Sequence, residues 1–215
     1  HALHMPSHIF TRLGHWRESA ATNRAAARAA RRDGWVGEEL HTTDYRVYAY
    51  LQLAEDRSAR EIVESLPART RELRPDGSSY QAGLYAAAAI PARAALELRD
   101  WAVAAELEVP GDLFPGGVWC WAEAPLHVAR GLGAVHTGRV ARADASVHAL
   151  AGCRERLLAD PQGGGADAET VKVNASLWAD RLDVQRRVLL AWLALGEGRS
   201  EEAVRLARAA ADLED

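Results

Sequence analysis

The chain has 215 residues, of which 48% are hydrophobic and 26% charged, and this composition excludes a disordered polymer. Its formal net charge of −4 gives no general attraction to nucleic acid or to an anionic membrane surface, so we expect neither as a partner. No apolar run approaches the roughly 20 residues that cross a bilayer, and no secretory leader is recognisable. We therefore expect a cytoplasmic protein. Because the chain begins at His1 and not at methionine, we also expect it to be a fragment of a longer protein.

The cysteine content excludes a disulfide framework and a cysteine-type zinc site, because only Cys120 and Cys153 occur. A reducing compartment fits this usage. Cys120 lies between Trp119 and Trp121, and such apolar neighbours favour a buried, unreactive thiol.

Helix is predicted almost throughout, because alanine, leucine and arginine dominate and runs of β-branched residues are absent. The breaks share one local context: an apolar helix end, a short polar or glycine turn, and then an alanine-rich helix. Five such turns occur, centred on Gly14, Ala54, Arg99, Gly138 and Gly198. Each resembles the turn between the two helices of a tetratricopeptide repeat (TPR), although the spacings of 40, 45, 39 and 60 exceed that repeat's period of 34.

These breaks predict an all-α, TPR-like α-solenoid of about five antiparallel helix pairs, forming a single domain over residues 1–215. In chain order, we expect a helix over about 17–32 and another over 80–98, with Pro91 bending the second. The extra residues fall in two glycine- and proline-containing loops, over 108–117 and 160–167.

The first chemical signal is a row of histidines near the start of the chain. His1, His4 and His8 are spaced i, i+3 and i+7, which places them on one face of a helix. Imidazole is polar and is a good metal ligand, so three of them on one stripe are unusual.

The repeat register extends this cluster. When the first two turns are aligned, His1 corresponds to His41 and His4 to Asp44, and equivalent positions on stacked repeats are neighbours on the concave face. Met5 then corresponds to Tyr45, and His8 to Tyr48. The third pair contributes two alanines, which we expect to leave a hollow, and Arg93 at its edge. The predicted metal ligands are His1, His4, His8, His41 and Asp44, and the predicted lining residues are Met5, Tyr45, Tyr48, Tyr85 and Arg93.

This ligand set suits zinc, iron(II) or copper(II). The thioether of Met5 mildly favours copper, a facial triad of two histidines and a carboxylate would suit iron, and a zinc-bound water would suit hydrolysis. The sequence does not choose between these ions. The alternative interpretation is that the polar side chains line a wet groove without a metal.

The segment from His1 to Trp16 resembles a signature of a mostly uncharacterised family of bacterial TPR-like proteins, as does the pattern His41-x-x-Asp44-Tyr45-x-x-Tyr48. The segments 89–93 and 178–186 are also similar to that family. The resemblance implies a TPR-like fold and, by default, a binding scaffold. Two hypotheses follow: a helical-repeat protein with a divalent transition metal site, which a metal-dependent enzyme would use, and a metal-free scaffold that binds a peptide or small molecule in its concave groove.

Overall fold

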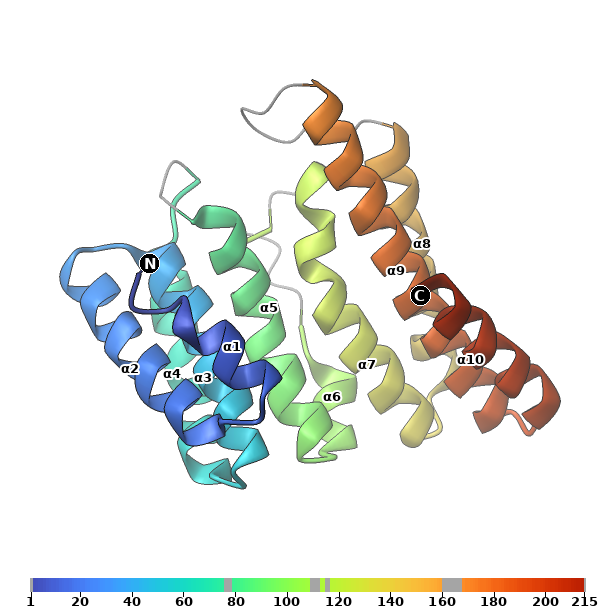
Figure 1. Ribbon diagram of the computed structural model, residues 1–215. Helices are drawn as coiled ribbons and strands as arrows, with labels where there is room; N and C mark the ends of the chain where they lie inside the picture. The colour runs from blue at the N-terminus through green and yellow to red at the C-terminus, as the bar shows by residue number, and fades with distance from the viewer. Residues whose placement is uncertain (1, 76–78, 109–112, 115–116, 160–167, 215) are drawn as a thin grey trace. The chain divides into compact units, whose positions relative to one another are not determined.

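The protein is all-helical across the part of the chain that the structure describes. A computed structural model describes residues 2–75, 79–108, 113–114, 117–159 and 168–214 (Figure 1). Within these ranges it has ten α-helices, one short 3-10 helix and no strand, which confirms the all-α prediction. None of the described helices combines the length and the apolar character that a bilayer crossing requires.

Two compact units divide the chain, His1–Arg99 and Asp100–Asp215, and each has its own set of helix contacts. The prediction of a single domain over residues 1–215 therefore stays a prediction.

The described residues of the first unit form five helices, and α3 packs against three of the other four. In chain order they are α1 (Pro6–Arg12), α2 (Trp16–Arg32), α3 (Val36–Gln52), α4 (Asp56–Thr70) and α5 (Tyr80–Glu97). Helix α2 packs against both α1 and α3, and α3 also packs against α4 and α5. Because α3 has neighbours on several sides, it buries charged residues as well as apolar ones, among them Glu38, Glu39 and Asp44.

Small side chains bring α3 and α5 together. Ala86 and Ala89 of α5, which were expected to leave a hollow, are each only 1% exposed. Their size lets the neighbouring helix approach closely, so this part of the predicted hollow is filled by packing. Pro91 lies inside α5, which continues through it to Glu97.

The five predicted turns share one backbone conformation. Gly14, Ala54, Arg99, Gly138 and Gly198 all have positive φ, between 52° and 80°. At Gly14 the amide of the next residue, His15, donates to the carbonyl of Phe10, and Glu55 donates to Tyr50 in the same way after Ala54. This bond closes a helix end in the Schellman motif, which glycine favours because its φ is unrestricted. The prediction of one recurring helix-ending turn is confirmed, even where alanine or arginine takes glycine's place.

The second unit contains the remaining helices. In chain order they are α6 (Trp101–Glu106), the 3-10 helix η1 (Gly117–Glu123), α7 (Ala124–His136), α8 (Val140–Ala159), α9 (Ala168–Gly196) and α10 (Ser200–Glu214). Helix α7 packs against α6, α8 and α9, and α10 packs against α9. Gly133 of α7 lies so close to α6 that a Cβ atom there would stand 2.7 Å from the carbonyl oxygen of Trp101.

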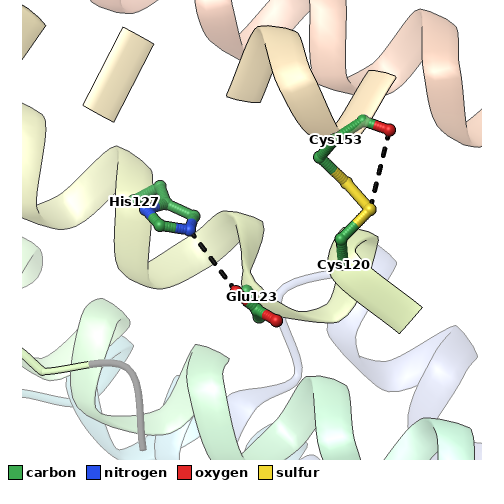
Figure 2. The surroundings of a disulfide bond; sticks show 4 residues. All are labelled: Cys120, Glu123, His127 and Cys153. Atoms are coloured by element: carbon green, nitrogen blue, oxygen red, sulfur yellow. Dashed lines mark hydrogen bonds and ion pairs between the residues drawn. A yellow bond between two sulfur atoms is a disulfide. The ribbon is translucent and has the colours of Figure 1, made fainter. Parts of the chain in front are cut away.

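The two cysteines form a disulfide, and this corrects the prediction of an unreactive thiol at Cys120. Cys120 on η1 is bonded to Cys153 on α8, with Cα atoms 5.6 Å apart (Figure 2). The burial of Cys120 was predicted correctly from its tryptophan neighbours, and Trp121 is itself buried and stacks on Trp178. The pairing of the two cysteines was not predictable, because it depends on how η1 packs against α8. Disulfides persist mainly in oxidising compartments, so this bond weighs against the cytoplasmic location, which stays a prediction.

Candidate metal centre

Three of the predicted ligands come together between α1 and the first half of α3. His4, His8 and His41 each place one ring nitrogen within 4.8 Å of the nitrogens of the other two. The ring centroids of His4 and His8, and of His4 and His41, are 4.7 Å apart in edge-on arrangements. His4 precedes α1 by two residues, His8 lies in its first turns, and His41 lies on α3, so two segments distant in sequence supply the group (Figure 1).

His4 is fully buried and its ring is held in one orientation. Its Nδ1 lies 2.7 Å from Oδ1 of Asn23, and Asn23 Nδ2 donates to the carbonyl of Ser19 at 2.9 Å. The second bond fixes which end of the amide faces the histidine, so Oδ1 accepts and Nδ1 carries the proton. Nε2 of His4 therefore carries the lone pair. The hydroxyl of Ser7 lies 3.2 Å from Nδ1 and supports the same orientation.

His8 is linked to a tyrosine that touches the whole group. Nδ1 of His8 and the phenol oxygen of Tyr45 are 3.1 Å apart. The Tyr45 ring lies edge-on to His4, His8 and His41, with centroid distances of 4.9, 4.9 and 5.5 Å. When Nδ1 of His8 donates to Tyr45, its Nε2 carries the lone pair, as in His4.

The environment keeps His4 and His41 neutral at pH 7. Burial lowers the pKa of His4 below 6.5; the hydrogen bond to Asn23 opposes this shift, and the charges of His41 and His8 add to it. Burial also lowers the pKa of His41 below 6.5, against the opposing charges of Glu38 and Asp44. Burial raises the pKa of the Tyr45 phenol, with a further contribution from Asp44, so this group stays protonated. A neutral imidazole is the form that binds a metal.

Asp44, predicted as the carboxylate ligand, is held by Arg93 instead. Nε and Nη2 of Arg93 donate to the two carboxylate oxygens of Asp44 at 2.9 and 3.2 Å. Burial would lower the pKa of Arg93, but the charge of Asp44, its hydrogen bonds and the charges of Tyr85 and Tyr48 together raise that pKa by more, so the guanidinium stays ionised. The group of ligand atoms within 4.8 Å of one another does not include Asp44. Its two oxygens are used by the guanidinium, which the sequence register had placed at the edge of the hollow.

The contacts between α1 and α3 are shifted from the predicted register by about one helical turn. Aligning the turns pairs positions 40 apart, so His4 was expected beside Asp44 and His8 beside Tyr48. In the structure His4 lies beside His41, and His8 binds Tyr45, a residue 37 positions away. A shift of three residues keeps the same helix face, which is why the histidines still meet although their individual neighbours differ.

The remaining predicted residues lie around or outside this group. Tyr48 stacks edge-on against Trp16 at 5.3 Å and receives the Arg93 guanidinium over its ring, also at 5.3 Å. Tyr85 is half-buried on α5, and its charge contributes to the pKa of Tyr45. Met5 is 46% exposed, so the reason for preferring copper is weakened. His1 lies outside the described residues.

Sequence reasoning missed two polar residues of this region, Asn23 and Glu38. Asn23 lies on the stripe of α2 that carries Ala20, Ala27 and Ala30, and it is fully buried. An asparagine in the middle of an alanine stripe was the available signal. Glu38 lies in the first turn of α3, where the helix dipole favours an acidic residue, but it is buried and only 5% exposed. The sequence pattern alone does not show that residue 38 lies on a buried side of α3.

No protein-family model, no curated protein and no solved structure matches this chain. The class of site is therefore defined by its geometry alone: a cluster of one buried and two part-buried histidines in a protein whose described part is all-helical.

Proposed function

We propose that this protein binds one divalent transition metal ion through His4, His8 and His41. The observation that carries the proposal is the approach of three ring nitrogens to within 4.8 Å of one another. Imidazole nitrogens are ligands for zinc, copper, iron and nickel, and zinc takes them at about 2.0–2.1 Å. A tetrahedral ion needs its nitrogens about 3.4 Å apart, so binding requires nitrogens that lie up to 4.8 Å apart to approach by up to about 1.4 Å.

The surroundings of the histidines support a ligand role over a purely structural one. Metal-bound histidines almost always donate their second ring nitrogen to an oxygen acceptor, and His4 does so to Asn23. Packing alone would place apolar groups at this buried position, because burying several polar rings is costly unless they have partners. Three imidazole nitrogens within 4.8 Å of one another instead match the requirements of a cation.

The geometry favours hydrolytic over oxygen chemistry. The iron-type facial triad needs a carboxylate, and Asp44 is used by Arg93. Three histidines on a tetrahedral zinc ion leave the fourth position for water, as in catalytic zinc sites. Zinc lowers the pKa of such a water to about 7, which makes hydroxide available at neutral pH. We therefore propose a zinc-dependent hydrolase or hydratase.

The fold proposed for this activity is a TPR-like array. Support comes from the turns, because five helix ends at irregular spacing adopt the same left-handed conformation and each joins two consecutive helices. Repetition of one hairpin turn is what a helical-repeat protein requires.

The proposal is tested on protein purified without a metal-affinity step. Elemental analysis and calorimetric titration with Zn²⁺ are expected to give one ion per chain, and the double variant His4→Ala, His8→Ala is expected to lose it. The matched control is the double variant His15→Ala, His148→Ala, which removes two exposed imidazoles and should retain the ion. Wild-type protein that binds no metal in excess Zn²⁺ would overturn the proposal and leave the peptide-binding scaffold as the better hypothesis.

A further inference from the structure

Arg46 of α3 is a half-buried guanidinium that holds no carboxylate. Its Nε is buried and has no hydrogen-bond partner among the described residues, and none of the ion pairs between those residues includes it. Its guanidinium carbon lies 6.0 Å from the centroid of the Tyr50 ring, one turn further along the helix. A buried polar group is unfavourable unless it has a partner, and arginine carries five N–H donors. Arg46 therefore differs from Arg93, which binds Asp44 of the same helix.

The packing of α2 against α3 places Arg24 beside Arg46. The two helices are joined by a turn at Gly34 and run in opposite directions, and Arg31 of α2 binds Glu39 of α3 at 2.8 Å. Arg24 lies seven residues before Arg31, and Arg46 lies seven residues after Glu39. Seven residues are two turns, which return to the same face about 10.5 Å along each helix. The level of Arg31 and Glu39 is therefore repeated by two cations.

The positive charge of this face exceeds the negative charge beside it. Helix α2 carries five arginines and a single glutamate, in a chain whose formal net charge is −4. The carboxylate of Glu39 is already bound by arginines of α2 and of α4. Burial lowers the pKa of Arg46, and the charges of Arg24 and Arg31 lower it further, although Tyr50 and Glu39 oppose the shift. An anion from outside the chain would relieve both the burial and the repulsion.

The same row of arginines borders a hollow in the surface. Arg28 lies four residues after Arg24 and three before Arg31, so the three side chains share one face of α2. The hollow has a volume of about 460 Å³ and is lined by Leu3, Ala25, Arg28, Ala29, Arg31 and Arg32. Small-molecule sites have volumes of about 300–1,000 Å³ and combine apolar side chains with a few polar groups. The hollow suits a small organic anion.

From this placement we propose that the arginine face of α2 and α3 binds a phosphomonoester. The phosphate group lies between Arg24 and Arg46, and the organic part lies in the hollow. The planar fork of arginine matches the oxygens of a phosphate, and a phosphate brings nearly two negative charges and three acceptor oxygens. A carboxylate brings one charge and two oxygens. This site does not depend on the proposed metal, because none of its residues belongs to the histidine group.

The test is calorimetric titration of inorganic phosphate and of phenyl phosphate at constant ionic strength. Metal-free protein is used, so that an ion at the histidines cannot recruit the phosphate. Wild type should bind one equivalent of either, and phenyl phosphate at least about threefold more tightly, because the hollow removes its ring from water. Arg46→Met should weaken binding about tenfold or more, since hydrogen bonds to charged groups are worth about 1.5–3 kcal/mol.

Two further variants make this titration decisive. Arg24→Met changes an exposed residue and should fold, and it should weaken binding about three- to fivefold. Arg60→Met removes an exposed arginine of α4 and is the control, with affinity within about twofold of wild type. Wild type that binds neither ligand, or Arg46→Met and Arg24→Met with unchanged affinity, would overturn the proposal. Phenyl phosphate that binds no more tightly than phosphate would overturn the role of the hollow.

The buried Nε–H of Arg46 gives a readout that general charge screening would not change. In a ¹⁵N-correlated NMR spectrum of metal-free protein, phosphate should shift this signal, which is identified by its loss in Arg46→Met. The Nε–H of Arg69 is the internal control: it is also buried without a partner, but Glu39 and Glu72 already hold its guanidinium, so its signal should stay. Equal shifts of both signals, or the same shift with acetate at equal ionic strength, would overturn the phosphate assignment.

Discussion

Replacing Asn23 tests whether this residue positions His4 for the metal ion or only fills space in the core. Asn23 is fully buried, and its Oδ1 accepts the Nδ1–H of His4 at 2.7 Å. Asn23→Leu keeps the volume approximately and removes the acceptor. The Ser7 hydroxyl, 3.2 Å from the same nitrogen, remains as a neighbouring acceptor.

The magnitude follows from these contacts. A buried donor that loses its partner costs about 1–3 kcal/mol, and the nearby Ser7 hydroxyl should limit the loss of unfolding free energy to about 1–2 kcal/mol. Loss of the outer partner of a ligating histidine should weaken zinc binding by about 10- to 100-fold, which corresponds to about 1.4–2.7 kcal/mol. Asn23→Asp keeps an acceptor and should retain at least wild-type zinc affinity.

The assay combines urea unfolding of the metal-free protein with calorimetric titration of Zn²⁺. Ser146→Ala is the control, because Ser146 is a buried polar residue of the second unit whose hydroxyl donates to the carbonyl of Arg142. Ser146→Ala should reduce stability without changing zinc affinity. Zinc binding by Asn23→Leu within twofold of wild type would refute the reasoning, because the orientation of His4 would then not matter to the ion.

Three further predictions concern stability. In the presence of a chelator, the free energy of unfolding should be highest above about pH 6.5 and should decrease as the pH falls below that value. The reason is that burial lowers the pKa of His4 and His41, so the unfolded chain binds more protons than the folded protein at low pH. Urea titrations at about pH 7.5 and about pH 5.5 measure this difference. Arg93→Met should cost about 3 kcal/mol in urea unfolding, since it leaves the buried Asp44 carboxylate without its partner, and adding Asp44→Asn should recover most of that loss. Gly133→Ala should lower stability by about 1–3 kcal/mol in the same assay, because its new methyl group meets the backbone of α6.

Each of these three predictions has a control or an outcome that would contradict it. Gly152→Ala on α8 is the partner of the Gly133 variant: its Cβ would meet only the end of the Arg156 side chain, at 3.5 Å, so it should raise stability by about 0.5–1 kcal/mol. Equal effects of the two glycine variants would contradict the packing argument. Stability that does not change between the two pH values would contradict the histidine argument, and an Arg93→Met cost below about 1 kcal/mol would contradict the ion-pair argument.

The parts of the structure that local sequence determines were predictable. A helix-ending turn is set by a few adjacent residues, so the positions of Gly14 and Gly198 could be located without tertiary information. Helical spacing predicted that His4 and His8 lie together, and aligning the turns predicted that His41 lies near them, although the contacts are shifted by about one helical turn.

What depended on distant partners could not be predicted. Asp44 carries a metal-ligand side chain, but its role is decided by Arg93, 49 residues further along. The Cys120–Cys153 bond joins residues 33 apart whose approach depends on how η1 packs on α8. Burial decides the role of Asn23, and a side chain's depth is a property of the packed unit.

The division of the ligands between two helices has a consequence for the lifetime of the protein. An ion held by His4, His8 and His41 would tie His41 to positions 33 and 37 residues earlier in the chain, and closing a loop of that length in the unfolded chain is worth about 4 kcal/mol on the entropy model used for cross-links. Loss of the ion would therefore loosen α1 from α3 before the rest of the unit. Proteases would then cleave first at the loosened α1, so the supply of metal in the surroundings would set how long this unit survives intact.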